Sequence, residues 1–101
     1  MAVKAARKAF EHGEWKEMSP AGRTKLMNKI ADNIEKNIDE LATIESIDNG
    51  KSFGMAKHDI GLGLSVFRYF AGYPDKIHGK TLPMNGPYQA VSQKVPIGVV
   101  G

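Results

Sequence analysis

The sequence predicts an α/β fold in which a helical first part is followed by a β-hairpin and an extended arm. Apolar residues recur every three or four positions up to about residue 70, which is the spacing of amphipathic helices. Two extended stretches then flank Asn85-Gly86. Residues 96–101 read as an apolar, β-branched strand, which a complete domain would rarely leave unpaired. We therefore expect the chain to be part of a larger fold.

Two helices are predicted in the first 41 residues. Residues 2–11 are alanine-rich, and His12-Gly13 ends this helix, with glycine at the usual C-terminal position. Ser19-Pro20 begins the second helix, because serine can cap free N–H groups and proline is tolerated in the first turn. An apolar stripe follows at helical spacing, and we expect it to lie on an apolar surface. It consists of Leu26, Ile30, Ile34, Ile38 and Leu41.

Two further helices complete the helical part. Asn37 is predicted to interrupt the pattern, because asparagine accepts left-handed backbone geometry. A third helix is predicted from about residue 39 to 47, stopped by Asp-Asn-Gly at 48–50, and a fourth from about 52 to 70. The fourth contains three glycines, each costing about 1 kcal/mol relative to alanine, which indicates close packing or a bend. They are Gly54, Gly61 and Gly63.

The remaining residues read as extended chain. Residues 80–84 and 88–95 are candidate strands on either side of Asn85-Gly86, a strong hairpin signal because both residue types accept positive φ. Three prolines each remove an N–H donor, which favours edge strands over a central position. They are Pro83, Pro87 and Pro96.

Composition excludes several classes of function. With 42% apolar and 25% charged residues, the 101-residue chain is typical of one small globular domain or part of one. The net charge of +3 is dispersed among acidic residues, so we expect no nucleic-acid partner. No apolar run approaches membrane-spanning length, so we expect no membrane partner. The absence of cysteine excludes a disulfide framework, a thiolate metal site and a thiol nucleophile within these residues.

Several segments carry a family resemblance. Residues 45–51 read Glu-Ser-Ile-Asp-Asn-Gly-Lys, and residues 68–83 read Arg-Tyr-Phe-Ala-Gly-Tyr-Pro-Asp-Lys-Ile-His-Gly-Lys-Thr-Leu-Pro. Both are similar, in the same order, to segments of NAD(P)-dependent aldehyde dehydrogenases. Residues 13–16 and 19–23 fit an earlier part of that family, and residues 96–101 resemble the strand that enters its cofactor domain.

The resemblance implies a division of the chain. Residues 1–87 would be the helical N-terminal part of the cofactor-binding domain, and residues 88–96 a subunit-bridging arm. Residues 97–101 would begin the first strand of a Rossmann-like cofactor domain. The resemblance implies that the intact parent enzyme, of which this chain would be a part, is a homodimer or homotetramer. Residues 91–96 keep the proline of the family's Tyr-Thr-Arg-x-Glu-Pro but not its aromatic and acidic positions, so the details of the oligomer contact do not carry over.

The resemblance also implies the chemistry of the parent: oxidation of aldehydes to carboxylic acids with NAD or NADP through a cysteine thioester. It places no catalytic and no cofactor-binding residue in this chain, which alone is expected to be inactive. The alternative is a small helical protein-interaction module without catalysis, burying its apolar stripe against a partner. The expected compartment is the cytoplasm, with the mitochondrial matrix as the alternative if the natural N-terminus precedes Met1.

Three residues are candidates for a site. Asp48 reads either as a turn aspartate bonding local N–H groups or, by the resemblance, as a ligand of a buried monovalent cation. His58 and Leu62 are four residues apart, so they share a helix face. The resemblance places both in the substrate entrance tunnel. The alternative interpretation is a surface histidine and a core leucine.

Other residues receive no catalytic role. Lys51, His78 and Lys80 have no partner at a defined spacing. Gly61-Leu62-Gly63 lies in mid-helix and lacks the strand–turn–helix context of a dinucleotide-binding loop. An aromatic group around Arg68 is interpreted as packing at the helix end; it consists of Tyr69, Phe70 and Tyr73.

Overall fold

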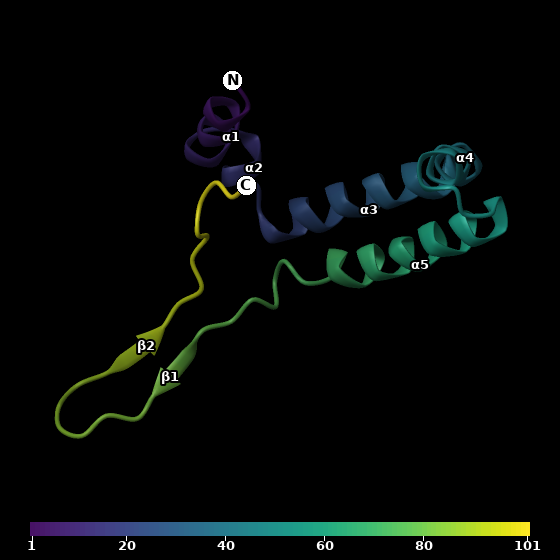
Figure 1. Ribbon diagram of the computed structural model, residues 1–101. Coiled ribbons are helices and arrows are strands. Elements are labelled where there is room, and N and C mark those ends of the chain that lie inside the picture. The colour runs from purple at the N-terminus through teal and green to yellow at the C-terminus, as the bar shows by residue number, and fades with distance from the viewer. The chain divides into compact units, whose positions relative to one another are not determined.

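Five helices and one two-stranded antiparallel sheet form the chain, whose residues 1–101 are all described by a computed structural model (Figure 1). The predicted mixture of helix and strand is therefore confirmed in its coarse form. The elements are α1 (Ala2–Glu11), α2 (Glu14–Glu17), α3 (Pro20–Lys36), α4 (Ile38–Asn49), α5 (Phe53–Ala71), β1 (Lys80–Leu82) and β2 (Ala90–Ser92). None of the helices combines the length and hydropathy that a membrane crossing needs.

The chain divides into two compact units. The first combines Met1–Ser19 with Lys76–Gly101, and the second is Pro20–Asp75. The boundaries of these units differ from the predicted division of the chain after residues 87 and 96. That division concerns a larger fold and stays a prediction.

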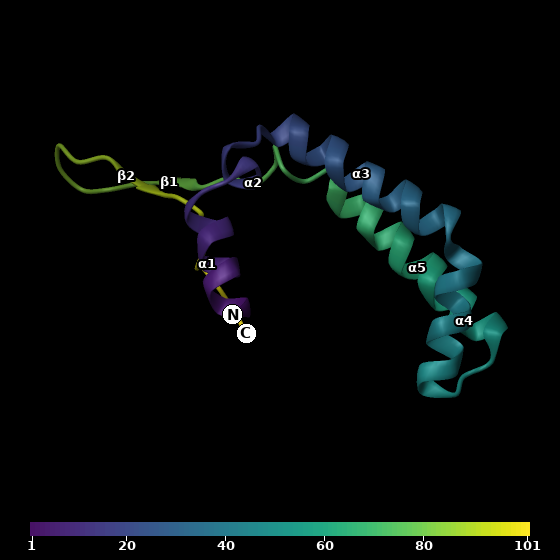
Figure 2. The ribbon, with the colours of Figure 1, turned by 90° about the horizontal axis from the view of Figure 1, so that it is seen from above.

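The second unit is a three-helix arrangement built around α5. This helix packs against both α3 and α4, and Figure 2 shows it running beside α3 with α4 at one end of the pair. The buried residues of the three helices are almost all alanine, which lets helix backbones approach closely. They are Ala31 on α3, Ala42 on α4, and Ala56, Leu64 and Ala71 on α5.

The predicted apolar stripe is only partly covered. Ile30 is 41% exposed, and the other four stripe residues are half-buried. Part of the stripe lines an open surface groove within the same unit, formed by Ile30, Asn33, Ile34, Asn37, Glu40 and Leu41. Alanine, which the stripe did not include, occupies the centre of the helix contacts instead.

The boundary between α3 and α4 falls at Asn37, as predicted, but the expected reason is wrong. Asn37 has φ −109° and ψ 21°, so its backbone is not left-handed. Its N–H donates to the carbonyl oxygens of Asn33 and Ile34, both at 3.2 Å. The side-chain amide donates to the same Asn33 carbonyl at 2.8 Å. The asparagine thus marks the boundary by bonding back to the end of α3.

The first unit contains the two short N-terminal helices. His12 is extended and Gly13 has φ +130°, so α1 ends where the sequence predicts. The single-turn helix α2 was not predicted, because four residues are too few to show a helical period.

The hairpin pairs β1 with β2 in the register Lys80↔Ser92, Thr81↔Val91 and Leu82↔Ala90. The Ser92 hydroxyl accepts a hydrogen bond from the Lys80 N–H at 2.9 Å. The predicted hairpin is confirmed, but its strands are shorter than the predicted 80–84 and 88–95. The connection runs from residue 83 to 89, and of Asn85 and Gly86 only the glycine has positive φ, at +88°. Prolines at 83 and 87 lack the N–H groups that would extend the ladder toward the turn.

Residues 97–101 do not form the predicted strand within this chain. Ile97 is 93% exposed and Val100 is 75% exposed. A Cβ added at Gly98 would lie 3.8 Å from the Arg7 guanidinium, so this segment passes close to α1. A strand forms only when its backbone N–H and C=O groups pair with a neighbouring strand. The position of residues 97–101 in a cofactor domain stays a prediction.

Candidate functional site

The junction between α4 and α5, residues 45–59, contains two of the three candidate residues, Asp48 and His58. Gly50 ends α4 in the left-handed conformation, with φ +79°. The Asn49 side-chain oxygen accepts the Lys51 N–H at 2.9 Å, and the Ser46 hydroxyl donates to the Lys51 carbonyl oxygen at 2.6 Å. These bonds fix the backbone of the turn at the point where α5 begins. Asn49, not the predicted Asp48, provides the side-chain acceptor at this turn.

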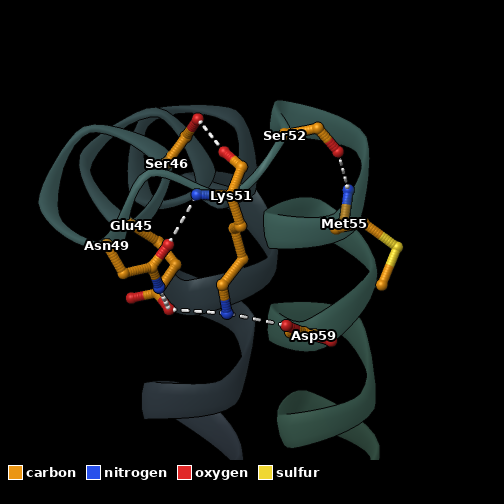
Figure 3. A network of polar contacts seen from close by, with 7 residues as sticks. All are labelled: Glu45, Ser46, Asn49, Lys51, Ser52, Met55 and Asp59. Atoms are coloured by element: carbon orange, nitrogen blue, oxygen red, sulfur yellow. Dashed lines mark hydrogen bonds and ion pairs between the residues drawn. The ribbon is translucent and has the colours of Figure 1, made fainter.

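The Lys51 side chain is the centre of the junction (Figure 3). Its Nζ lies 3.0 Å from Glu45 on α4 and 2.8 Å from Asp59 on α5. The hydrogen bonds to Asp59 and Glu45 raise the pKa of the Lys51 ammonium, and the same Lys51 contact lowers the pKa of the Asp59 carboxyl. One cation therefore compensates two carboxylates from two helices.

This network was not predicted. Lys51 was assigned no partner from the sequence because Glu45 and Asp59 lie six residues before and eight residues after it. A signal was present once the helix ends were predicted. A lysine in a turn between two helices can reach an acidic residue about one turn back in the first helix and two turns forward in the second.

Two further contacts hold the start of α5. The Ser52 hydroxyl caps the helix by accepting the Met55 N–H at 3.4 Å. Lys57 on α5 pairs with Asp39 on α4 at 2.5 Å. The Ser52 cap is local to α5, whereas the Lys57 pair and the Lys51 pairs join α5 to α4 within the unit Pro20–Asp75.

His58 and Leu62 lie on one face of α5, as the spacing predicts. Leu62 is 60% exposed, so its interpretation as a core leucine is wrong. The face continues along the helix, and all of its residues are exposed. We call it the outer α5 face; it consists of Met55, His58, Leu62, Val66 and Tyr69. The buried residues of α5 occupy the opposite side, so the helix presents an apolar surface outward around one histidine.

Asp48 lies in the last turn of α4 and is exposed. No group of three or more histidine, cysteine or acidic side chains in the chain could hold a metal ion. A monovalent cation at Asp48 would take its other oxygen ligands from residues outside this chain.

The residues present do not form a dinucleotide site. Gly61 and Gly63 lie inside α5, where their N–H groups belong to the helix, whereas a phosphate-binding loop presents free N–H groups at a helix start. A Cβ at either glycine would meet no atom within 4 Å. Of the two explanations predicted for these glycines, close packing or a bend, close packing is therefore wrong within this chain.

The aromatic group at the end of α5 is confirmed. Tyr69, Phe70 and Tyr73 have ring centroids between 5.1 and 5.4 Å apart, and the Tyr69 and Tyr73 hydroxyls lie 3.0 Å from each other. That hydrogen bond raises the pKa of the Tyr69 hydroxyl. All three rings remain at least 38% exposed, so this cluster lies on the surface of the unit.

Comparison with known proteins identifies the family. The sequence model described as the aldehyde dehydrogenase family matches residues 1–101. The chain belongs to the aldehyde dehydrogenase family. This confirms the resemblance seen in residues 45–51 and 68–83.

Individual aldehyde dehydrogenases support the assignment. Aldehyde dehydrogenase 1 of Tanacetum cinerariifolium is 51% identical over 102 residues, covering 100% of this chain. The mitochondrial benzaldehyde dehydrogenase of Antirrhinum majus is 46% identical over 101 residues, covering 99% of this chain and 19% of its own length. The structure of an aldehyde dehydrogenase from Bacillus cereus in complex with NAD+ superposes with a TM-score of 0.82 at 46% identity, covering 89% of this chain and 18% of that one. The chain spans about 20% of the length of the curated aldehyde dehydrogenases it matches.

Proposed function

We propose that this chain provides the N-terminal helices and hairpin arm of an NAD(P)-dependent aldehyde dehydrogenase that oxidises aldehydes to carboxylic acids. One observation carries the proposal. The family match extends over residues 1–101, while the chain covers only 18–20% of the relatives and solved structure that it resembles at 46–51% identity. The chain therefore has the sequence and fold of one section of a much larger enzyme.

The chemistry would lie outside these residues. The proposed reaction begins with attack of a cysteine thiol on the aldehyde and ends with hydrolysis of a thioester, and this chain contains no cysteine. NAD(P)+, when bound elsewhere in the enzyme, accepts the hydride. The role of this chain in the enzyme would be structural, because it supplies a folded helical unit and the outer α5 face. The isolated chain is accordingly proposed to be inactive.

The outer α5 face is the proposed contribution to the aldehyde path. His58 and Leu62 would line the substrate entrance tunnel, and their exposure on one helix face supports this role. A mainly apolar surface with the polar groups of His58 and Tyr69 suits small aldehydes, which combine an apolar body with a single carbonyl acceptor.

Asp48 is the proposed ligand of a monovalent cation. Its carboxylate is exposed at the end of α4, where it is available to a site completed by oxygen atoms from elsewhere in the enzyme.

Residues 88–96 are the proposed subunit-bridging arm of a homodimer or homotetramer, and residues 97–101 the start of a strand in a Rossmann-like domain. Exposure supports both proposals: Tyr88 is 72% exposed, Val91 67% and Ile97 93%. Apolar side chains so exposed gain most from a covering partner. The proposed compartment is the cytoplasm; relatives named as mitochondrial make the matrix the alternative.

A chimera tests the function. Residues 1–101 replace the matching segment of the Bacillus cereus enzyme, and NADH formation from an aldehyde is measured. We expect turnover by the chimera and none by the isolated 101-residue chain. The same enzyme lacking the segment is the control. A chimera that is soluble and folded but inactive would overturn the proposal, as would turnover by the isolated chain.

A further inference from the structure

The charges at the α4–α5 junction are unevenly balanced. Lys51 lies within 3.0 Å of both Glu45 and Asp59, so one positive charge faces two negative charges. The side chains are 32–44% exposed, and the group therefore lies at the surface of the unit. Removal of the lysine would leave two uncompensated carboxylates facing each other across the junction.

Asp59 borders the outer α5 face. It lies four residues after Met55 and three before Leu62, and residues three or four apart are neighbours on a helix surface. Figure 3 shows Asp59 below Met55 on α5, with the Lys51 ammonium reaching it from the α4 side. The carboxylate that Lys51 compensates is thus adjacent to the residues proposed to line the aldehyde path.

We propose that Lys51 is a specificity-determining residue, which masks the Asp59 carboxylate beside the aldehyde path and so disfavours cationic aldehydes relative to uncharged ones. The inference rests on the proposed function of the outer α5 face. Lys51 touches no substrate in this role. It acts through Asp59, whose charge and position it fixes.

The physical basis is the attraction of a cationic substrate to an unmasked carboxylate. Unit charges about 4 Å apart attract each other in water by an energy that corresponds to roughly a fivefold change in binding. An ion-paired carboxylate loses most of this attraction, because the ammonium cancels its field at short range. Lys51 should therefore affect cationic and neutral aldehydes differently, whereas a merely structural residue would affect both alike.

The chain offers a matched control in Lys57. Lys57 also joins α5 to α4 through an ion pair, with Asp39. It precedes His58 by one residue and so lies about 100° around the helix from it, away from the outer α5 face. Lys57→Met makes the same change in charge and breaks the same kind of contact, but it unmasks no carboxylate beside Leu62.

The test uses the Bacillus cereus chimera and two aldehydes of nearly equal shape, cationic betaine aldehyde and neutral 3,3-dimethylbutanal. The measured quantity is the ratio of their kcat/KM values. We expect Lys51→Met to raise this ratio in favour of the cation by about fivefold, mainly through KM. Lys57→Met should leave the ratio unchanged.

Two further variants keep the test decisive if Lys51→Met also loosens the fold. Lys51→Arg should retain the original ratio, because arginine keeps the charge. The double variant Lys51→Met/Asp59→Asn should move the ratio back toward its original value, because the carboxylate next to Leu62 is removed. An active chimera whose ratio is the same in Lys51→Met and Lys57→Met would overturn this inference and leave the proposed function standing. A folded, inactive chimera would overturn both.

Discussion

The guanidinium of Arg68 on α5 lies 2.9 Å from the carboxylate of Asp32 on α3, a contact between residues 36 positions apart. The same Arg68 nitrogen donates to Glu35 at 2.6 Å. One arginine thus joins α5 to α3 at the end opposite the Lys51 junction, and its pKa is raised by both hydrogen bonds. The three aromatic rings that were expected around Arg68 contact one another, while the Arg68 guanidinium contacts α3.

We expect Arg68→Met to lower the thermal midpoint of the 101-residue chain at low salt and to have less effect at about 1 M salt. The partner carboxylates are 67% and 62% exposed, so dissolved ions screen the pair. Thermal unfolding followed by circular dichroism at two salt concentrations provides the measurement. Lys29→Met, an exposed change on α3, is the control. A destabilisation that is independent of salt would contradict the electrostatic explanation.

The alanine contacts between the helices predict a low tolerance for larger side chains. Ala56 is completely buried where α5 meets its neighbours. Ala56→Leu should destabilise the chain by about 1–3 kcal/mol, because the added atoms force the helices apart. Met55→Leu, at an adjacent position that is 56% exposed, should change stability by less than about 0.5 kcal/mol. Urea unfolding of both variants tests this, and similar losses in the two would argue against a close contact at Ala56.

Two glycines should respond in opposite directions to the same substitution. Gly63 lies within α5 with open space around its missing Cβ, so Gly63→Ala should stabilise the chain by about 0.5–1 kcal/mol. Gly50 has φ +79°, and Gly50→Ala should destabilise it by about 1–2 kcal/mol. Urea unfolding again provides the free energies. Stabilisation by both substitutions would mean that Gly50 does not require its left-handed conformation.

The hairpin depends on the absence of a side chain at Gly79, directly before β1. A Cβ at this position would overlap the carbonyl oxygen of Ser92. We expect Gly79→Ala to shift or abolish the β1–β2 pairing, seen as loss of the nuclear Overhauser contacts between Thr81 and Val91. Gly54→Ala, at a site with open space, should leave these contacts in place. Their survival in Gly79→Ala would contradict the observed approach of the two strands.

The Lys51–Asp59 pair predicts a pH dependence. Because Lys51 lowers the pKa of Asp59 below its ordinary value of 3.8, the pair stabilises the fold above pH 3.8, and this contribution is lost as the pH falls through the lowered value. Because the pKa of Lys51 is raised above 10.5, the contribution is lost at the alkaline end only as the pH rises through that raised value.

The stability difference between wild type and Lys51→Met should therefore be constant around neutral pH and shrink in acid. Urea unfolding of both proteins at stepwise lower pH measures it. A difference that stays undiminished well below pH 3.8 would show that Lys51 acts through packing of its aliphatic chain instead of its charge.

The local elements could be predicted because their signals are local. Ser52 and Gly50 show where one helix begins and another ends, since capping and left-handed geometry depend on single residues. The hairpin was predicted from Asn85-Gly86, but its turn was not, because the effect of the flanking prolines depends on how far the ladder extends.

The helix packing and the candidate site were harder to predict from the sequence. Four of the five buried core residues are alanines, whereas hydrophobic periodicity gives most weight to large side chains. The Lys51 pairs cross between two helices, so they follow only from the relative placement of α4 and α5. His58 and Leu62 could be assigned to one face from their spacing, but only the structure shows that this face is turned away from the core.

The alanine core has a consequence for how sequence variation should be read in this protein. In an autonomous domain the buried positions accept the fewest substitutions and the exposed positions accept the most. Here many large apolar residues are exposed, among them Ile47 at 80% and Leu62 at 60% exposure. In the proposed enzyme these residues would meet the other four-fifths of the polypeptide. A mutational scan of the enzyme under selection for activity should therefore find two classes of position that do not tolerate substitution. One is the buried alanine positions, and the other is positions that are exposed to water in the 101-residue segment by itself.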